Sequence, residues 1–89
     1  MLDRMVTIVN KLGLHARAAA KFVNLASSFS SSIKVTRNGQ EVNGKSIMGI
    51  MMLAASRGSE IRILADGEDE TEAIDRLAEL IDQRFGEDE

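Results

Sequence analysis

With 89 residues, of which 44% are apolar and 28% charged, the chain has the size and composition of one small globular domain, which we expect to span residues 1–89. It contains no cysteine, which excludes disulfides, thiolate metal ligands and a cysteine nucleophile. No apolar run approaches the roughly 18–20 residues of a membrane span, and the N-terminal segment lacks the apolar core of a signal peptide. We therefore expect a cytoplasmic protein that does not insert into membranes.

The net charge of −3 is divided unevenly along the chain. Residues 1–65 contain nine Lys and Arg against three Asp and Glu, whereas residues 66–89 contain two Arg against eleven acidic residues. We therefore expect a basic side and an acidic C-terminal helix. Because the three Phe are the only aromatic residues and the total charge is negative, we expect no binding to nucleic acid.

The N-terminal third predicts a strand followed by a helix. Residues 5–10 alternate, with Val6 and Ile8 on one face, as in a half-buried strand. Gly13 interrupts this pattern, and from Ala16 the apolar residues follow a helical period. The helical stripe comprises Ala19, Phe22, Val23, Ala26 and Phe29. The serine-rich run at residues 27–32 ends this helix.

The middle of the chain predicts a hairpin and a short helix. A strand carrying Ile33 and Val35 is followed by Asn38-Gly39, a pair that favours the two-residue hairpin turn because both turn positions need a positive φ. A short strand at residues 41–42 and a turn at 43–44 lead into an apolar helix over residues 47–55, which Arg57-Gly58 ends.

The last third predicts a strand and a helix. Residues 59–66 alternate, with Ile61 and Ile63 on one face, and Gly67 opens a helix with acidic residues 68–70 in its first turn, where they complement the helix dipole. The helical stripe comprises Ile74, Leu77, Ile81 and Phe85, and we expect the tail 86–89 to fray. The order β-α-β-β-α-β-α predicts one α+β domain with its helices on a single side of one sheet.

His15 lies where a glycine-containing loop enters the first helix. The first N–H groups of a helix lack intrahelical acceptors and carry the positive end of the dipole, so a helix N-terminus binds anions. A phosphoryl group on this nucleophilic imidazole would lie at the helix N-terminus, close to an arginine able to form charge-assisted hydrogen bonds. The cradling residues would be Ala16, Arg17 and Ala18. Position alone also fits a helix cap or a surface histidine, and a metal site is disfavoured because there is no second His or Cys.

Two motifs resemble those of the HPr family of bacterial phosphocarriers. Residues 13–23, Gly-Leu-His-Ala-Arg-Ala-Ala-Ala-Lys-Phe-Val, resemble the family's active-site signature G-L-H-[AT]-R-P-A. Residues 45–51, Lys-Ser-Ile-Met-Gly-Ile-Met, resemble its regulatory-serine segment. The spacing of the motifs and the order of elements also suit the family, so the resemblance covers about residues 5–85.

The resemblance implies an open-faced sandwich, in which a four-stranded antiparallel sheet of order 1-4-2-3 carries three helices on one face. It also implies a phosphocarrier, rather than an enzyme, that accepts a phosphoryl group on Nδ1 of His15 from phosphorylated enzyme I and passes it to IIA domains of a phosphotransferase system. Arg17 matches the arginine that holds the phosphoryl group. No cofactor is implied, we expect a monomer, and the sugar-uptake and nitrogen-regulatory branches both stay open.

One position departs from the family signature, because Ala18 stands where the family has Pro. A proline would bias Arg17 away from helical angles and would lack an N–H group. We therefore expect Arg17 to be less constrained here, and the phosphorylated form to be retained with an altered lifetime.

Ser46 precedes the apolar helix and predicts an N-cap. The resemblance adds regulatory phosphorylation of this serine by HPr kinase/phosphorylase. The helix that follows has too many apolar residues to bury, and we expect Ile47 and Met48 to be exposed for partner docking. The candidate docking residues are Lys11, Lys21, Lys45, Ile47, Met48 and Met51, with Arg17 completing a basic rim.

Two other classes of function fit the sequence less well. A regulatory adaptor of the same fold would bind proteins without relaying phosphate, but such paralogues tend to lack the histidine that this chain keeps at position 15. A small-molecule-binding α+β module would show a glycine-rich nucleotide loop or an aromatic-lined pocket, and the sequence has neither.

Overall fold

The computed structural model describes all residues 1–89. In chain order the elements are β1 (Leu2–Thr7), α1 (Ala16–Ser27), β2 (Ser32–Arg37), β3 (Gln40–Asn43), α2 (Ile47–Met52), β4 (Glu60–Asp66), α3 (Glu70–Asp82) and a short 3-10 helix η1 (Arg84–Gly86). The predicted order β-α-β-β-α-β-α is therefore confirmed. No helix combines the length and apolar character that crossing a bilayer requires.

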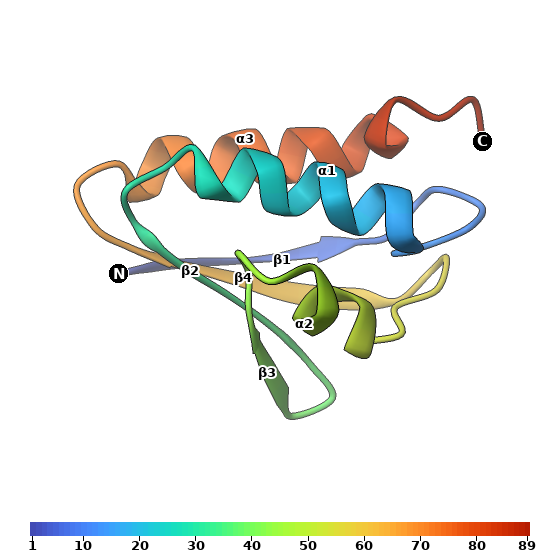
Figure 1. The fold of residues 1–89 in the computed structure, drawn as a ribbon, viewed down its shortest axis with the longest axis horizontal. Coiled ribbons are helices and arrows are strands. Elements are labelled where there is room, and N and C mark those ends of the chain that lie inside the picture. Colours follow the sequence, from blue (N-terminus) through green and yellow to red (C-terminus); the bar gives the residue numbers. More distant parts are fainter.

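The four strands form one sheet in the order β1-β4-β2-β3, and every neighbouring pair is antiparallel. In Figure 1, α1 and α3 run side by side over the sheet, and α2 packs beside α1 and next to β3. This arrangement leaves the other face of the sheet open. The open-faced sandwich that the family resemblance implied is confirmed.

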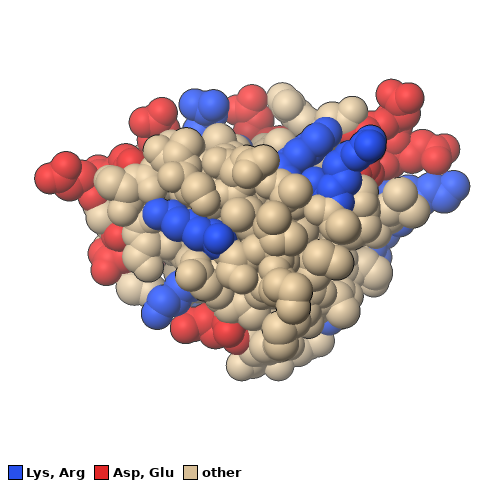
Figure 2. Space-filling view, in the orientation of Figure 1, with Lys and Arg blue, Asp and Glu red and all other residues tan.

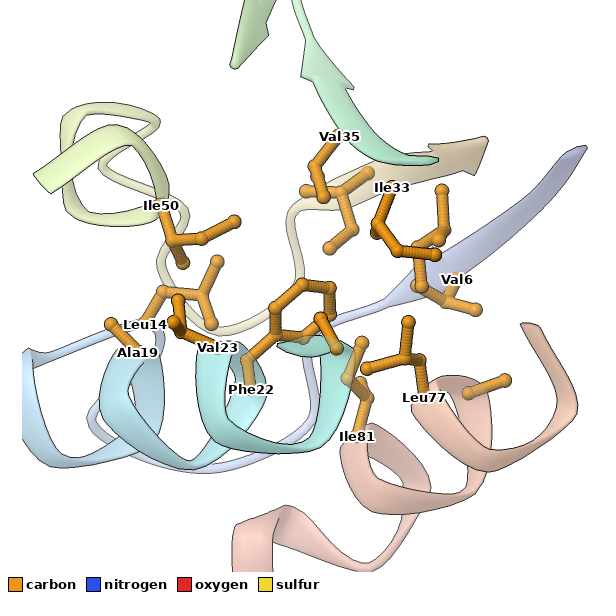
Figure 3. Close-up of a cluster of buried hydrophobic side chains, with 14 of the residues drawn as sticks. Val6, Leu14, Ala19, Phe22, Val23, Ile33, Val35, Ile50, Leu77 and Ile81 are labelled. Carbon is orange, nitrogen blue, oxygen red and sulfur yellow. The ribbon is translucent and has the colours of Figure 1, made fainter. Parts of the chain in front are cut away.

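The hydrophobic core fills the space between the sheet and the helices. Figure 3 shows Phe22 of α1 and Ile81 of α3 directed toward the sheet residues Ile33 and Val35. Each of these four side chains is at most 2% exposed. Burial of an apolar side chain of this size stabilises the fold by roughly 1.5–3 kcal/mol. The predicted apolar stripes of the two long helices are thus the surfaces that cover the sheet.

The β2–β3 hairpin has the predicted turn. Asn38 and Gly39 have φ values of 51° and 82°, and the residues flanking them, Arg37 and Gln40, are paired across the two strands. Asparagine and glycine tolerate this left-handed conformation better than other residues, which is why this pair marks the turn in the sequence.

Two predicted boundaries are wrong by about three residues. β1 begins at Leu2 and ends at Thr7, rather than covering residues 5–10, because it pairs with residues 60–65 of β4. α2 ends at Met52 rather than near residue 55, because Ala54 adopts a φ of 50° and turns the chain. Strand pairing in the first case, and a left-handed backbone in the second, override the local apolar pattern.

The start of α3 also differs from the prediction, since the helix begins at Glu70, three residues after Gly67. The carboxylate of Asp69 accepts hydrogen bonds from the Ser31 hydroxyl and from the backbone N–H groups of Ser30 and Ser31. The Ser31 hydroxyl, followed by the Ser30 amide, lowers the pKa of Asp69 to about 2. Asp69 therefore ties the start of α3 to the segment before β2 instead of lying in the first helical turn.

The C-terminal tail does not fray, and this expectation was wrong. Phe85 is only 1% exposed, and its carbonyl oxygen accepts a hydrogen bond of 2.6 Å from Nζ of Lys21. Farther along, the carbonyl oxygen of Glu89 accepts a hydrogen bond of 3.1 Å from the backbone N–H of Lys11. These contacts hold the tail against the loop between β1 and α1.

Candidate functional site

His15 is the N-cap residue of α1, at the end of the loop that follows β1. Its backbone is extended, with φ −72° and ψ 177°, and its carbonyl oxygen accepts the first helical hydrogen bond from Ala19. The preceding residue, Leu14, is buried and donates its backbone N–H to the Ala55 oxygen at 2.9 Å. The imidazole, 28% exposed, is thus held at the surface by a buried anchor on one side and a helix on the other.

Gly13 lets the loop approach the chain segment after α2. Its φ is +67°, and a Cβ at this position would lie 2.5 Å from the backbone oxygen of Ala55. A side chain at position 13 would therefore need both a left-handed conformation and a displaced neighbour. The glycine of the sequence motif has a geometric role here, because it sets the position from which His15 enters the helix.

Three backbone amides at the start of α1 have no backbone acceptor, those of Ala16, Arg17 and Ala18. The His15 side chain makes no capping hydrogen bond to them. Ala16 and Arg17 are exposed, whereas Ala18 is completely buried, so the amides of the first two residues are those at the surface. Together with the helix dipole, these free donors make this end of α1 favourable for an anion.

Glu87 of the C-terminal tail contacts the His15 ring, although the two residues are distant in the sequence. The Nε2 atom of His15 lies 2.5 Å from one carboxylate oxygen of Glu87. The other carboxylate oxygen accepts a hydrogen bond of 3.0 Å from the Asn10 amide, which also donates to the Gly13 carbonyl oxygen at 2.9 Å. Neither sequence motif pointed to Glu87; the one local signal was Phe85, which extends the apolar stripe of α3 and is buried.

Burial alone would raise the pKa of the Glu87 carboxyl group, but the hydrogen bonds from His15 and Asn10 outweigh it and lower the pKa overall. Glu87 is therefore ionised at neutral pH. An ionised carboxylate only accepts hydrogen bonds, so its contact with Nε2 places the ring proton of neutral His15 on that nitrogen. Nδ1 is then the ring nitrogen that keeps a free electron pair.

The site forms a shallow open hollow between the loop, the first turn of α1 and the tail. Its lining residues are Lys11, Leu12, His15, Arg17, Glu87, Asp88 and Glu89. Lys11 pairs with Glu89 at 3.4 Å, whereas the exposed Arg17 takes part in no ion pair within the chain. Arg17 is therefore the cation beside His15 that is free to bind an incoming anion.

The predicted basic rim is divided between the two ends of α1. Lys11, Arg17 and Lys21 lie around the C-terminal tail, near His15. Lys45 instead donates to the carbonyl oxygen of Phe29, just beyond the far end of α1, at 2.8 Å. Lys45 is therefore separated from the cations next to the histidine.

Ser46 caps α2, as predicted, because its hydroxyl oxygen accepts a hydrogen bond of 3.1 Å from the Gly49 N–H. The following residues include the exposed apolar side chains Ile47 and Met48, which are 42% and 73% exposed. Met51 and Met52 are exposed too. Figure 2 shows that the surface over α2 is largely free of charged side chains, with Lys and Arg side chains beside it. We call Ile47, Met48, Met51 and Met52 the α2 patch.

Comparison with known protein families and proteins finds relatives along the whole chain. The family described as "PTS HPr component phosphorylation site" matches residues 2–83. The phosphocarrier protein HPr of Cupriavidus necator is 58% identical over 89 residues, which cover 100% of both chains. The HPr-like protein Crh of Bacillus subtilis is 45% identical over 83 residues, covering 93% of this chain and 98% of that protein.

Solved structures show the same fold. The crystal structure of HPr-C-His from Thermoanaerobacter tengcongensis superposes with a TM-score of 0.96 at 50% identity, and the match covers 100% of both chains. The phosphocarrier protein HPr of Bacillus anthracis gives a TM-score of 0.87 at 44% identity, covering 90% of this chain and 95% of that one.

Proposed function

This chain belongs to the HPr family of phosphotransferase-system phosphocarriers, and we propose that His15 carries the phosphoryl group on Nδ1 while Arg17 and the first amides of α1 hold its oxygens. As a phosphocarrier it is a shuttle between partner proteins and not an enzyme in its own right. The observation that carries the proposal is the free Nδ1 of a surface histidine at a helix N-terminus with unpaired amides.

The transfer needs little more than correct placement of charge. The Nδ1 electron pair of neutral His15 attacks phosphorus, the bond from phosphorus to the donor breaks, and the electron pair of that bond stays with the donor. The three phosphoryl oxygens then lie near the amides of Ala16 and Arg17 and within reach of the Arg17 guanidinium. The second transfer, to the acceptor, is the same displacement with His15 as the leaving group.

The donor is phosphorylated enzyme I and the acceptors are IIA domains, and the protein works as a monomer in the cytoplasm. The α2 patch and the cations of α1 form the docking surface, with Lys11, Lys21, Ile47, Met48 and Met51 as contact residues and Lys45 at its distant edge. Methionine side chains adapt to differently shaped partners, which suits a carrier that meets both a donor and several acceptors. The cations favour encounter with acidic partner surfaces.

Incubation of the protein with phosphoenolpyruvate and enzyme I tests the central proposal. We expect one acid-labile phosphate, located on His15 by mass spectrometry, and no phosphate on a His15→Ala variant. Phosphorus NMR distinguishes attachment at Nδ1 from attachment at Nε2. A protein that binds enzyme I or a IIA domain but stays unmodified would instead be a regulatory adaptor of the same fold.

Ser46 is the site at which HPr kinase/phosphorylase would regulate the carrier. The residue is only half-buried and lies at a helix start, where a phosphate is electrostatically favoured. A phosphate there would place a double negative charge at the edge of the α2 patch and weaken docking by acidic partners. ATP and the kinase should label the wild type and not Ser46→Ala; a phosphate on another serine, or none, would contradict this role.

A further inference from the structure

The C-terminal tail is built to reach His15. Phe85 is buried, Gly86 turns the chain with a φ of 79°, and the backbone of Glu89 is bonded to the backbone of Lys11. Glu87 lies between these two attachment points, and its side chain is 18% exposed. The carboxylate is therefore held in place from both sides along the chain and is not a freely rotating surface group.

Both oxygens of this carboxylate have a donor. Asn10, itself completely buried, donates from its amide to one oxygen at 3.0 Å, and His15 Nε2 lies 2.5 Å from the other. The Asn10 amide also donates to the carbonyl oxygen of Gly13. Asn10 thus links the tail to the same loop that carries the histidine, and the three side chains form one connected group.

We propose that Glu87 is a positioning residue for phosphoryl transfer: its carboxylate holds the His15 ring in the Nε2–H tautomer, with Nδ1 free to attack, and balances the positive charge that the ring acquires. This inference rests on the proposed role of His15 as the phosphoryl carrier. It adds to that role a residue that neither of the two sequence motifs contains.

The charge balance follows from the bonds that change. Neutral His15 has its proton on Nε2 and an electron pair on Nδ1; when Nδ1 bonds to phosphorus and the donor leaves with its electron pair, the ring keeps the Nε2 proton and becomes cationic. A carboxylate bonded to that proton stabilises the cation as it forms. The other charged groups that line the hollow around the ring are Lys11, Arg17, Asp88 and Glu89, and Lys21 of α1 lies close to Glu87; none of them bonds to Nε2.

Two substitutions separate the two parts of the role. Glu87→Ala removes both the hydrogen bond and the charge, whereas Glu87→Gln keeps an oxygen that can accept from Nε2–H but removes the charge. Asp88→Asn is the matched control, because it removes one negative charge from the same tail but leaves the bond to His15 Nε2 intact. Thermal unfolding of each variant checks that the folded domain is retained.

The first readout is the nitrogen NMR spectrum of the His15 ring at a pH where the ring is neutral. We expect the Nε2–H tautomer in the wild type, in Glu87→Gln and in Asp88→Asn, and a mixture of tautomers in Glu87→Ala. The second readout is the rate of phosphorylation by enzyme I and phosphoenolpyruvate. We expect Glu87→Ala to be about tenfold slower, the lower end of what a hydrogen bond to a charged group supports, with Glu87→Gln between it and the wild type.

The outcomes distinguish this inference from the proposed function. If wild-type His15 is phosphorylated and Glu87→Ala matches it in rate or in tautomer, the inference is overturned and the proposed function stands. A slower Glu87→Ala whose tautomer is unchanged overturns it too, because the tail would then act by docking. If wild-type His15 stays unmodified, the proposed function fails and the inference fails with it.

Discussion

Substitution of Gly13 by alanine tests whether the loop before α1 positions His15. The residue has a φ of +67°, and its added Cβ would lie 2.5 Å from the Ala55 oxygen and 2.9 Å from the Ser56 Cα. A left-handed conformation costs an alanine roughly 1–2 kcal/mol, and overpacking typically costs about 1–3 kcal/mol more. We therefore expect Gly13→Ala to lower the free energy of unfolding by about 2–5 kcal/mol.

Gly58 provides a matched control for the conformational part of this cost. Its φ is +89°, and no atom lies within 4 Å of the Cβ that an alanine would add. Gly58→Ala should therefore cost only the roughly 1–2 kcal/mol of the left-handed backbone. Urea unfolding of the two variants measures the difference, which is the contribution of the contact with Ala55.

The phosphorylation rate of folded Gly13→Ala links this contact to function. Because Leu14 is bonded to Ala55, displacement of the loop moves His15 relative to the helix start. We expect slower phosphorylation by enzyme I for Gly13→Ala than for Gly58→Ala, after correction for the folded fraction. Equal destabilisation of the two variants, or equal rates, would refute the argument that close packing at Gly13 positions the histidine.

Three further predictions concern other parts of the molecule. The pKa of Asp69 is lowered from 3.8 to about 2, so the stability that this carboxylate contributes is present above pH 4 and lost as the pH falls toward 2. Acid unfolding of Asp69→Asn should therefore depend less on pH in this range. An unchanged profile would contradict the stabilising role of the Asp69 carboxylate. Ala18 has an N–H without a backbone acceptor, so Ala18→Pro should fold while constraining Arg17. We expect the half-life of phosphorylated His15 to differ between this variant and the wild type. Identical half-lives would count against a role for position 18. Met48→Asp should raise the KM of enzyme I for this carrier about tenfold without loss of stability, because the side chain is 73% exposed. Met5→Asp, on the open face of the sheet, is the control. An equal effect of the two substitutions on KM would exclude the α2 patch as the docking surface.

The sequence predicts the fold well because each strand and long helix repeats its apolar residues with a clear period. Ile61 and Ile63 alternate along β4 and are both buried, and Ile74 and Leu77 follow the helical period of α3 and are buried as well. Such local patterns predict which face of an element is buried. They do not predict where an element stops, and the position of β1 was wrong because β4, far along the chain, determines its length.

The candidate site was predicted only in part, because local sequence patterns predict local features and not long-range contacts. His15, Arg17 and Ser46 belong to local motifs, and the structure places His15 and Ser46 at the helix starts where the sequence suggested. Glu87 lies 72 residues after the histidine and belongs to a short acidic run that has no periodicity. Only the packing of Phe85 and the hydrogen bonds from Asn10 and Lys11 bring this carboxylate to the ring. The residues next to Glu87 in the sequence do not predict these long-range contacts.

The two termini differ in what can be joined to them. Glu89 lines the hollow beside the histidine, so an affinity tag or reporter domain fused behind it would crowd the surface that partners must approach. Met1 lies at the opposite end of the molecule, where its amino group pairs with Glu70 at the start of α3 (Figure 1). A dye or fusion partner attached before Met1 would leave the hollow open, which makes the N-terminus the suitable end for labelling a functional carrier.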